Sequence, residues 1–304
     1  MTLFKYREIS RTSIFTTCEL IFSPPSKFSD PFECRPKSKS PDDDKDFQRR
    51  ILSHYSNSMK KEILLHVSKL SELKSMTSDQ IQQQVDAFIQ SYIDDRILKP
   101  SSLFDIILRK KIDDIVYSAD DTDIGILSLT SSNDNQVMWA QYAGMHTGFA
   151  IGFNTNDEFF NVLDDGIGTP MKVCYSTERP TWLMSDIQFS RYLTKSMDFM
   201  YEQEWRVLRK LSDGVKLETT TNDSIADLKP PLSRFRFNPS AVSEVILGAN
   251  MDIEERFKLV HYLHNDPKWK HVQLFIARPD PSEYKMNIDP LPDLYYTYQD
   301  QVLD

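Results

Sequence analysis

Segments with strand character lie near both ends of this 304-residue chain, and a long stretch with helical periodicity separates them. From about residue 45 to residue 117 the apolar residues recur every three or four positions, which is the spacing of one helix face. Before this stretch, and again after Gly125, short apolar or alternating segments bounded by turn residues are typical of β-strands. Strands so far apart in sequence must share a sheet. We therefore expect one α+β domain over residues 1–304, with a helical insertion at residues 45–117.

The predicted strands share a length of four to eight residues and a high content of β-branched and aromatic side chains. They read LFKYREIS, CELIFSPP, IGILSLT, GFAIGF, MKVCY, EWRVLRK, SRFRF, VSEVILG and HVQLFIA. Three further segments show helical spacing: NQVMWAQYAGM, SRYLTKSMDF and IEERFKLVHYLH. A central sheet, antiparallel or mixed, is the expected architecture.

Composition excludes several classes of protein. With 40% hydrophobic and 12% aromatic residues the chain can bury a core, and its net charge of −9 without a basic stripe argues against a protein that coats duplex DNA. The three cysteines, Cys18, Cys34 and Cys174, lack the spacing of a zinc site or a disulfide framework. No signal peptide or membrane span is recognisable. We expect a cytoplasmic protein with no membrane partner and no bound metal.

The stretch FMYEQEWRVLRK at residues 199–210 contains the most suggestive polar pattern. In a helix, Glu202 and Arg206 would form a surface ion pair worth only about 0.3–0.5 kcal/mol. In a strand, Glu202, Glu204 and Arg206 would point to one face, with successive side chains about 7 Å apart. Because EWRVLRK has strand character, we predict a strand from Glu204 onwards, preceded by a helix, with all three side chains lining a pocket.

Two N-terminal segments carry polar residues with two interpretations each. Arg7, in KYR on the first strand, is either a surface charge at a sheet edge or a group that binds phosphate or carboxylate. In SDPFE, Asp30 and Glu33 could face a cleft while Phe32 anchors the loop in the core. Alternatively, Asp30 only shapes a turn.

A third segment, Ser128 to Phe153, brings aromatic residues together. Trp139 and Tyr142 lie one turn apart on a predicted helix, and His146 follows shortly after. These side chains could form a stacking pocket for a nicotinamide or a base, or they could be an aromatic core cluster with one hydrogen-bonded histidine. Gly148, just before a strand, permits close approach of a ligand or of backbone.

Taken together, these motifs resemble a bacterial family catalogued as domain of unknown function 2971. KYR, SPPSKFSDPFE, LSLTSSNDNQVMWAQYAGMHTGFAIGF, YEQEWRV and VILG match it in order and spacing, from Phe4 to Gly248. Its members occur in bacteria and phage-related islands, commonly near defence or mobile-element genes. The residues on which its recurring positions fall are Arg7, Asp30, Pro31, Phe32, Trp139, Tyr142, His146, Gly148, Glu202, Glu204 and Arg206.

A second resemblance concerns chemistry. An Arg on the first strand, hydroxyl residues on a middle strand and a late Glu-x-Glu look like the order of the ADP-ribosyltransferase superfamily. That resemblance implies NAD as a substrate: Arg7 would hold its phosphates, Thr130 or Ser131 would support Arg7, and Glu204 would bind the nicotinamide ribose. Glu202 would orient or deprotonate the acceptor. A carboxylate beside the ribose would stabilise the oxocarbenium-like transition state of glycosidic cleavage.

The same resemblance implies that Trp139, Tyr142, His146 and Arg206 complete the nucleotide site. The acceptor of ADP-ribose, whether protein, nucleic acid, small molecule or water, and the oligomeric state stay open.

Two other classes remain in competition. One is a nuclease whose ligands or acid and base groups would be Asp30, Glu33, Glu202, Glu204 and His146. The other is a sensor that binds a nucleotide or peptide through Arg7, His146 and Arg206 without turnover. Metal dependence of any activity would distinguish the nuclease, and recovery of an unchanged ligand would favour the sensor.

Overall fold

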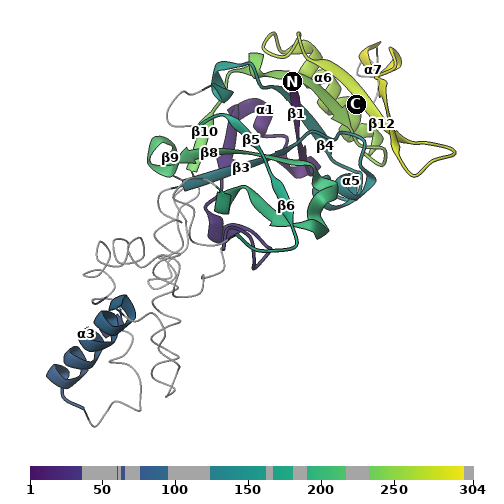
Figure 1. Cartoon of the computed structure of the whole chain (residues 1–304). Helices are drawn as coiled ribbons and strands as arrows, with labels where there is room; N and C mark the ends of the chain where they lie inside the picture. The colour runs from purple at the N-terminus through teal and green to yellow at the C-terminus, as the bar shows by residue number, and fades with distance from the viewer. Residues whose placement is uncertain are drawn as a thin grey trace.

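A computed structural model of the chain describes residues 1–35, 60, 63–65, 76–94, 124–161, 167–180, 190–216 and 233–297. Its largest element is a mixed eight-stranded sheet (Figure 1). In spatial order the strands are β13 (Met286–Pro290), β12 (Gln273–Pro279), β11 (Val242–Leu247), β4 (Phe149–Asn154), β1 (Thr2–Arg7), β3 (Ile124–Thr130), β8 (Glu204–Lys210) and β5 (Pro170–Lys172). β11 and β12 run parallel, whereas the other neighbours are antiparallel. The predicted α+β class, with a sheet assembled from distant strands, is confirmed.

Five further strands form two small sheets. β2 (Glu19–Phe22), β10 (Ser233–Arg236) and β9 (Val215–Lys216) form one, and β6 (Cys174–Ser176) pairs with β7 (Thr194–Ser196) in the other. The predicted strand MKVCY is thus divided between β5 and β6, which belong to different sheets.

Two of the predicted helices are confirmed, and each begins at a side-chain cap. α5 (Gln136–Tyr142) starts at Asn135, whose side chain accepts hydrogen bonds from the next turn, and α6 (Ile253–Asn265) starts in the same way at Asp252. The shorter helices are α1 (Ile14–Thr17), α7 (Leu294–Thr297) and the 3-10 turns η1 (Ile9–Arg11), η2 (Pro25–Lys27), η4 (Glu158–Phe160), η7 (Leu211–Asp213) and η9 (Pro239–Ala241).

The helix predicted in SRYLTKSMDF is wrong. This segment forms the 3-10 turn η5 (Ser190–Tyr192), then β7, then the 3-10 helix η6 (Met197–Glu202). Tertiary contacts override the helical spacing here. The carbonyl of Tyr192 accepts from Arg206, and the ammonium of Lys195 pairs with Glu202 and Glu204. An α-helix over this segment would break these contacts.

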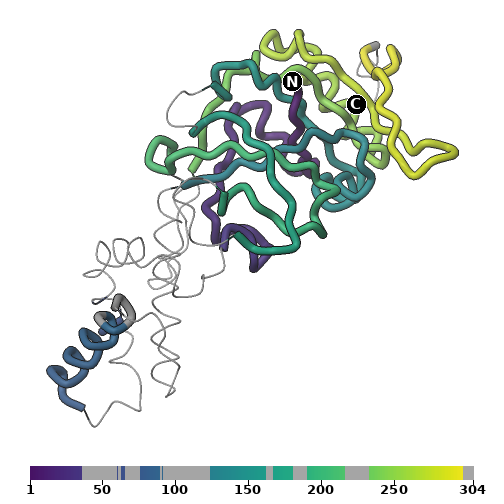
Figure 2. The backbone as a smooth tube through the Cα atoms, in the orientation of Figure 1, coloured from purple at the N-terminus to yellow at the C-terminus, as the bar shows by residue number. Residues whose placement is uncertain are grey.

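The structure describes α3 (Ser78–Asp94) within the predicted helical insertion, and the rest of residues 45–117 falls largely outside the described residues. Val85, Phe88 and Ile89 are its buried side chains, and Asp86 pairs with Lys60 at 3.0 Å. α3 stands apart from the eight-stranded sheet (Figures 1 and 2).

Two apolar clusters cover opposite faces of the sheet, because neighbouring residues of a strand point to opposite sides. Leu3 of β1 belongs to the larger cluster, to which α6 contributes Leu259 and Val260. Phe4 belongs to the other, together with Trp139 of α5. None of the helices in the described ranges is long and apolar enough to cross a membrane.

Candidate functional site

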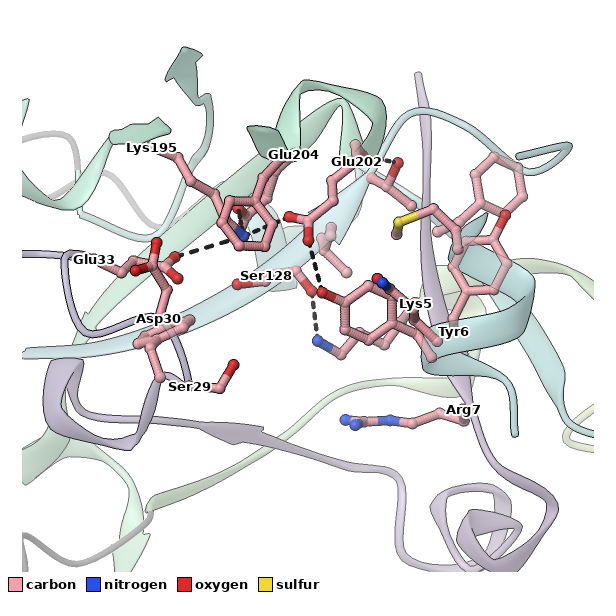
Figure 3. Close-up of a pocket in the computed structure, with 18 of the residues that line it drawn as sticks. Lys5, Tyr6, Arg7, Ser29, Asp30, Glu33, Ser128, Lys195, Glu202 and Glu204 are labelled. Carbon is pink, nitrogen blue, oxygen red and sulfur yellow. Dashed lines mark hydrogen bonds and ion pairs between the residues drawn. The ribbon is translucent and has the colours of Figure 1, made fainter. Parts of the chain in front are cut away.

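A cavity of about 450 Å³ is bordered by β1 and β3, at the place where these two strands separate (Figure 3). β1 pairs with β4 along its whole length, but its register with β3 consists of Phe4 opposite Thr130. Beyond this pair the ammonium of Lys5 donates a hydrogen bond to the carbonyl of Ser128 over 2.6 Å. A side chain thus replaces the missing strand partner and leaves space beside it.

Three kinds of side chain make up most of the cavity lining. The carboxylates are Glu8, Asp30, Glu33, Glu202 and Glu204, with Lys195 among them. The basic wall, as we call the cations contributed by β1 and the segments after it, consists of Lys5, Arg7, Arg11 and Lys27. The aromatic side chains are Phe4, Tyr6, Phe28, Tyr142 and Phe199. This combination suits a ligand that carries both an anionic group and a planar ring.

Behind the carboxylates, Arg206 of β8 is fully buried and holds two of them. Its guanidinium contacts both oxygens of Glu204, at 2.9 and 3.0 Å, and also donates to Glu33. It donates in addition to the carbonyl of Tyr192 over 2.5 Å and lies over the ring of Phe28. The fork of the guanidinium therefore fixes the strand β8 and the segment containing Glu33 relative to one another.

Lys195 of β7 connects this arrangement to Glu202. Its ammonium lies 2.5 Å from Glu202, 3.2 Å from Glu204 and 3.8 Å from Glu33. Burial lowers the pKa of Lys195, but Glu204 and Glu202 outweigh that effect and raise it, so Lys195 is charged at neutral pH. We call these four residues, together with Arg206, the ion-pair network.

The ion-pair network contains three carboxylates and two cations, which leaves it with one uncompensated negative charge if all five groups are ionised. Burial raises the pKa of Glu204, and the ammonium of Lys195 opposes that shift. Glu202 presents its second oxygen to the hydroxyl of Tyr142, which donates to it over 2.6 Å. Burial and Glu202 together raise the pKa of Tyr142, so this hydroxyl remains a proton donor.

The backbone between the two glutamates explains how both reach the same cavity. Glu202 ends η6, Glu204 begins β8, and Gln203 between them has a left-handed conformation with φ of 45°. Such a conformation costs free energy in a residue other than glycine, and contacts from β3 hold it here. The hydroxyl of Thr130 donates to the carbonyl of Glu202 over 2.6 Å. The backbone N–H of Ser131 donates to the carbonyl of Gln203 over 3.3 Å.

The basic wall has a different electrostatic character, because its inner members repel one another. Burial, and next the charge of Arg7, lower the pKa of Lys5 to about 7. Burial, and next Arg11, lower the pKa of Arg7 to about 10. Figure 3 shows the guanidinium of Arg7 extending from β1 into the cavity beside Lys5. Among the described residues neither Lys5 nor Arg7 forms an ion pair, so this part of the wall is suited to a negatively charged ligand.

Replacing Lys5 by glutamine is expected to stabilise the unliganded protein at pH 6 by about 1–2 kcal/mol, with a smaller effect at pH 9. The unfolded chain keeps the lysine proton up to its ordinary pKa of 10.5, whereas the folded chain releases it near 7. Below pH 7 the folded protein therefore holds an unfavourable charge on Lys5. As the pH rises from about 7 to 10.5 the folded protein loses this charge before the unfolded chain does, so the free energy of unfolding increases. Urea unfolding of both proteins across this pH range measures the difference.

Lys27→Gln is the matched control, since Lys27 lies exposed on the rim of the same cavity. Its unfolding free energy should change by less than about 0.5 kcal/mol at either pH. A Lys5→Gln protein less stable than the wild type at pH 6 would contradict the interpretation of Lys5 as a buried, strained cation.

Many residues singled out from sequence do meet at this cavity. Those that line it are Arg7, Asp30, Glu33, Thr130, Tyr142, Glu202 and Glu204. Arg206 lies behind them in the ion-pair network rather than at the cavity surface. Asp30 also accepts a hydrogen bond from the backbone of Phe32 over 2.8 Å, so the turn-shaping interpretation of this residue holds as well.

Four expected residues lie elsewhere. Trp139 is buried in the core, edge-on to Tyr6, so the core-cluster interpretation is correct for it. His146 is in a left-handed loop position and does not line the cavity. Ser131 is exposed and bonds to Gln203, and Phe32 is 61% exposed instead of anchoring its loop in the core. The packing of α5 against β1 separates Trp139 from Tyr142, although both were expected in one pocket.

Two residues that line the cavity, Lys195 and Lys5, were not predicted from the sequence. Lys195 gave no signal, because its segment has helical spacing. Lys5 did give one, since it lies two residues before Arg7 on a strand and so on the same face. Among the described residues no group of three or more His, Cys, Asp or Glu side chains is placed to hold a metal ion.

The family described as "Protein of unknown function (DUF2971)" matches residues 138–207 of the chain. The match runs from α5 to β8 and includes Tyr142, Lys195, Glu202, Glu204 and Arg206. The resemblance to this family is thereby confirmed over the segment that carries most of the ion-pair network. No curated protein and no solved structure matches the chain significantly.

Proposed function

We propose that the cavity binds NAD and cleaves the bond between nicotinamide and ribose, and that ADP-ribose passes to an acceptor or to water. The observation that carries this proposal is the division of one cavity into a basic wall and a carboxylate wall. Phosphates would bind to Lys5 and Arg7, and the ribose would then lie near Glu202. An enzyme of this kind fits an effector against phage or a toxin, the setting in which the family occurs.

Cleavage breaks the bond between C1′ of the ribose and the ring nitrogen of nicotinamide. The electron pair leaves with nicotinamide, which departs as a neutral molecule, and positive charge develops on the ribose. Glu202 is the carboxylate best suited to stabilise that charge, since it lines the cavity and, unlike Glu204, is not held by Arg206. The acceptor adds to C1′ and loses a proton, for which a carboxylate is a suitable base.

Glu204 takes a supporting role in this proposal. Both of its oxygens accept from Arg206, and one also faces Lys195, so its charge is largely compensated. Tyr142 remains the aromatic side chain best placed to contact nicotinamide, because it lines the cavity and donates to Glu202. Trp139 has no such role, since it is buried beside Tyr6.

The test is nicotinamide release by the purified full chain, incubated with NAD with and without cell extract, and followed by chromatography. Glu202→Gln is expected to reduce the rate by about a hundredfold or more, because an amide keeps the contact with Tyr142 but loses the negative charge. Release by the wild type should persist when a chelator removes divalent metals.

Glu255→Gln, on the exposed face of α6, is the matched control and should release nicotinamide at the wild-type rate. Thermal unfolding of each variant verifies that it is folded. If the wild type neither releases nicotinamide nor binds NAD, in buffer or in extract, the proposal is wrong.

A further inference from the structure

The inner part of the basic wall contains two cations with no carboxylate partner. In the part of the chain that the structure describes, neither Lys5 nor Arg7 forms an ion pair, although both project from β1 into the cavity (Figure 3). Lys5 reaches only a neutral acceptor, the carbonyl of Ser128. Both side chains are partly withdrawn from water, and cations in such places are ordinarily paired, so this couple in a cavity indicates an anionic ligand.

The arrangement of the basic wall indicates more than one phosphate. Lys5 and Arg7 are two apart on the strand, about 7 Å along it, and Arg11 lies close enough to Arg7 to affect its charge. Lys27 adds a fourth cation at the exposed rim. Four cations along one cavity fit a diphosphate better than a single phosphate group.

We propose that Lys5 and Arg7, with Arg11 at the rim, bind the diphosphate of a nucleotide, and that Lys5 takes up a proton as this group enters. This inference rests on the phosphate-binding half of the proposed function and is independent of glycosidic cleavage.

The proton uptake follows from the charges that face Lys5. Arg7 and Lys195 disfavour its ammonium form, whereas Glu204 and Glu202 favour it, and burial adds the largest unfavourable contribution. The result for the empty cavity is a pKa of about 7. A diphosphate next to the ammonium adds a strong favourable interaction, which raises the pKa of Lys5 in the complex. Above pH 7 binding therefore draws a proton from solution.

The experiment is titration calorimetry of the full chain with ADP-ribose in two buffers of different ionisation enthalpy. ADP-ribose is the probe because its diphosphate has no group that titrates near neutral pH, so any proton exchanged belongs to the protein. The wild type is expected to take up about 0.5–0.9 proton per site at pH 8, and close to none at pH 5.5. Its affinity should fall by up to about tenfold per pH unit above pH 7.

Two variants separate proton uptake from binding. Lys5→Arg carries a permanent charge and should bind ADP-ribose with no proton uptake at pH 8. Lys5→Gln lacks the charge and should bind about tenfold more weakly at pH 6, also without uptake. Adenosine, which has no phosphate, should bind with the same affinity at pH 6 and pH 8 if it binds at all.

The outcomes distinguish this inference from the proposed function. Proton uptake that the wild type shows and Lys5→Arg lacks supports the inference. If the wild type binds ADP-ribose without proton uptake, or if Lys5→Arg still takes up a proton, the role of Lys5 is wrong. Neither result bears on NAD cleavage, which the nicotinamide-release assay tests. No binding of ADP-ribose at any pH overturns the diphosphate site, and nicotinamide release then decides the enzymatic proposal separately.

Discussion

Replacing Arg206 by methionine is expected to lower the free energy of unfolding by about 3–5 kcal/mol, the cost of removing one partner from a buried ionic group. The substitution would leave Glu33 and Glu204 buried without their guanidinium. Lys195 cannot replace it, because its ammonium is already shared with Glu202. Urea unfolding, monitored by circular dichroism, measures the change in the free energy of unfolding.

A matched control is Arg234→Met. Arg234 also pairs with a glutamate, Glu19 at 3.2 Å, but its side chain is 38% exposed. Its removal should cost less than about 1 kcal/mol. A combined variant, Glu33→Gln with Arg206→Met, should recover part of the lost stability, since one of the unpaired charges is then gone. A loss below 1 kcal/mol for Arg206→Met would show that the ion-pair network does not hold this part of the fold together.

Replacing Gly148 by alanine is expected to destabilise the protein by about 3 kcal/mol, at the upper end of what overpacking usually costs. A Cβ atom at this position would lie 2.0 Å from the carbonyl oxygen of Arg7 and 3.0 Å from that of Ala143. Both are backbone atoms, which cannot rotate away as a side chain can. The end of β1 would have to move away from β4, and Arg7 would move with it.

Thermal unfolding and ADP-ribose affinity together test this expectation. Gly144→Ala, in the same loop, is the control: its φ of 56° is unfavourable for alanine, but the nearest atom to a new Cβ would be a side-chain oxygen of Thr147 at 3.1 Å. That substitution should cost about 1 kcal/mol. If Gly148→Ala were no less stable than Gly144→Ala, the close contact between β1 and the loop before β4 would be unimportant.

Most of the fold could be predicted from local sequence, because strand formation depends on alternation and composition that short segments display. IGILSLT and EWRVLRK have the same bounds in the structure as in the sequence pattern. The order of strands could not be obtained in this way, since pairing of β1 with β4 and β3 depends on contacts between distant residues.

The relative positions of site residues could be predicted when the residues lie on one strand. They could not be predicted when the residues come from segments that are distant in sequence. The spacing of Glu204 and Arg206 predicted that both side chains lie on one face of a strand, and in β8 they do and contact each other. What spacing could not indicate is that Arg206 would be fully buried, since this depends on Glu33 and Tyr192 covering it. Trp139 and Tyr142 were separated by the packing of α5, which turns one side chain into the core and leaves the other at the cavity.

Strand β1, which supplies Lys5 and Arg7 of the basic wall, precedes the other strands of the eight-stranded sheet in the chain but lies inside it, between β4 and β3. Arg206 leaves the ribosome roughly 200 residues after Lys5. At about 5–20 residues per second, translation therefore takes about 10–40 s to supply Lys195, Glu202, Glu204 and Arg206 after Lys5 and Arg7 have emerged. During that interval the growing chain carries Lys5 and Arg7 without most of the ion-pair network. Any activity that needs both sides of the cavity can therefore begin only after translation has passed β8.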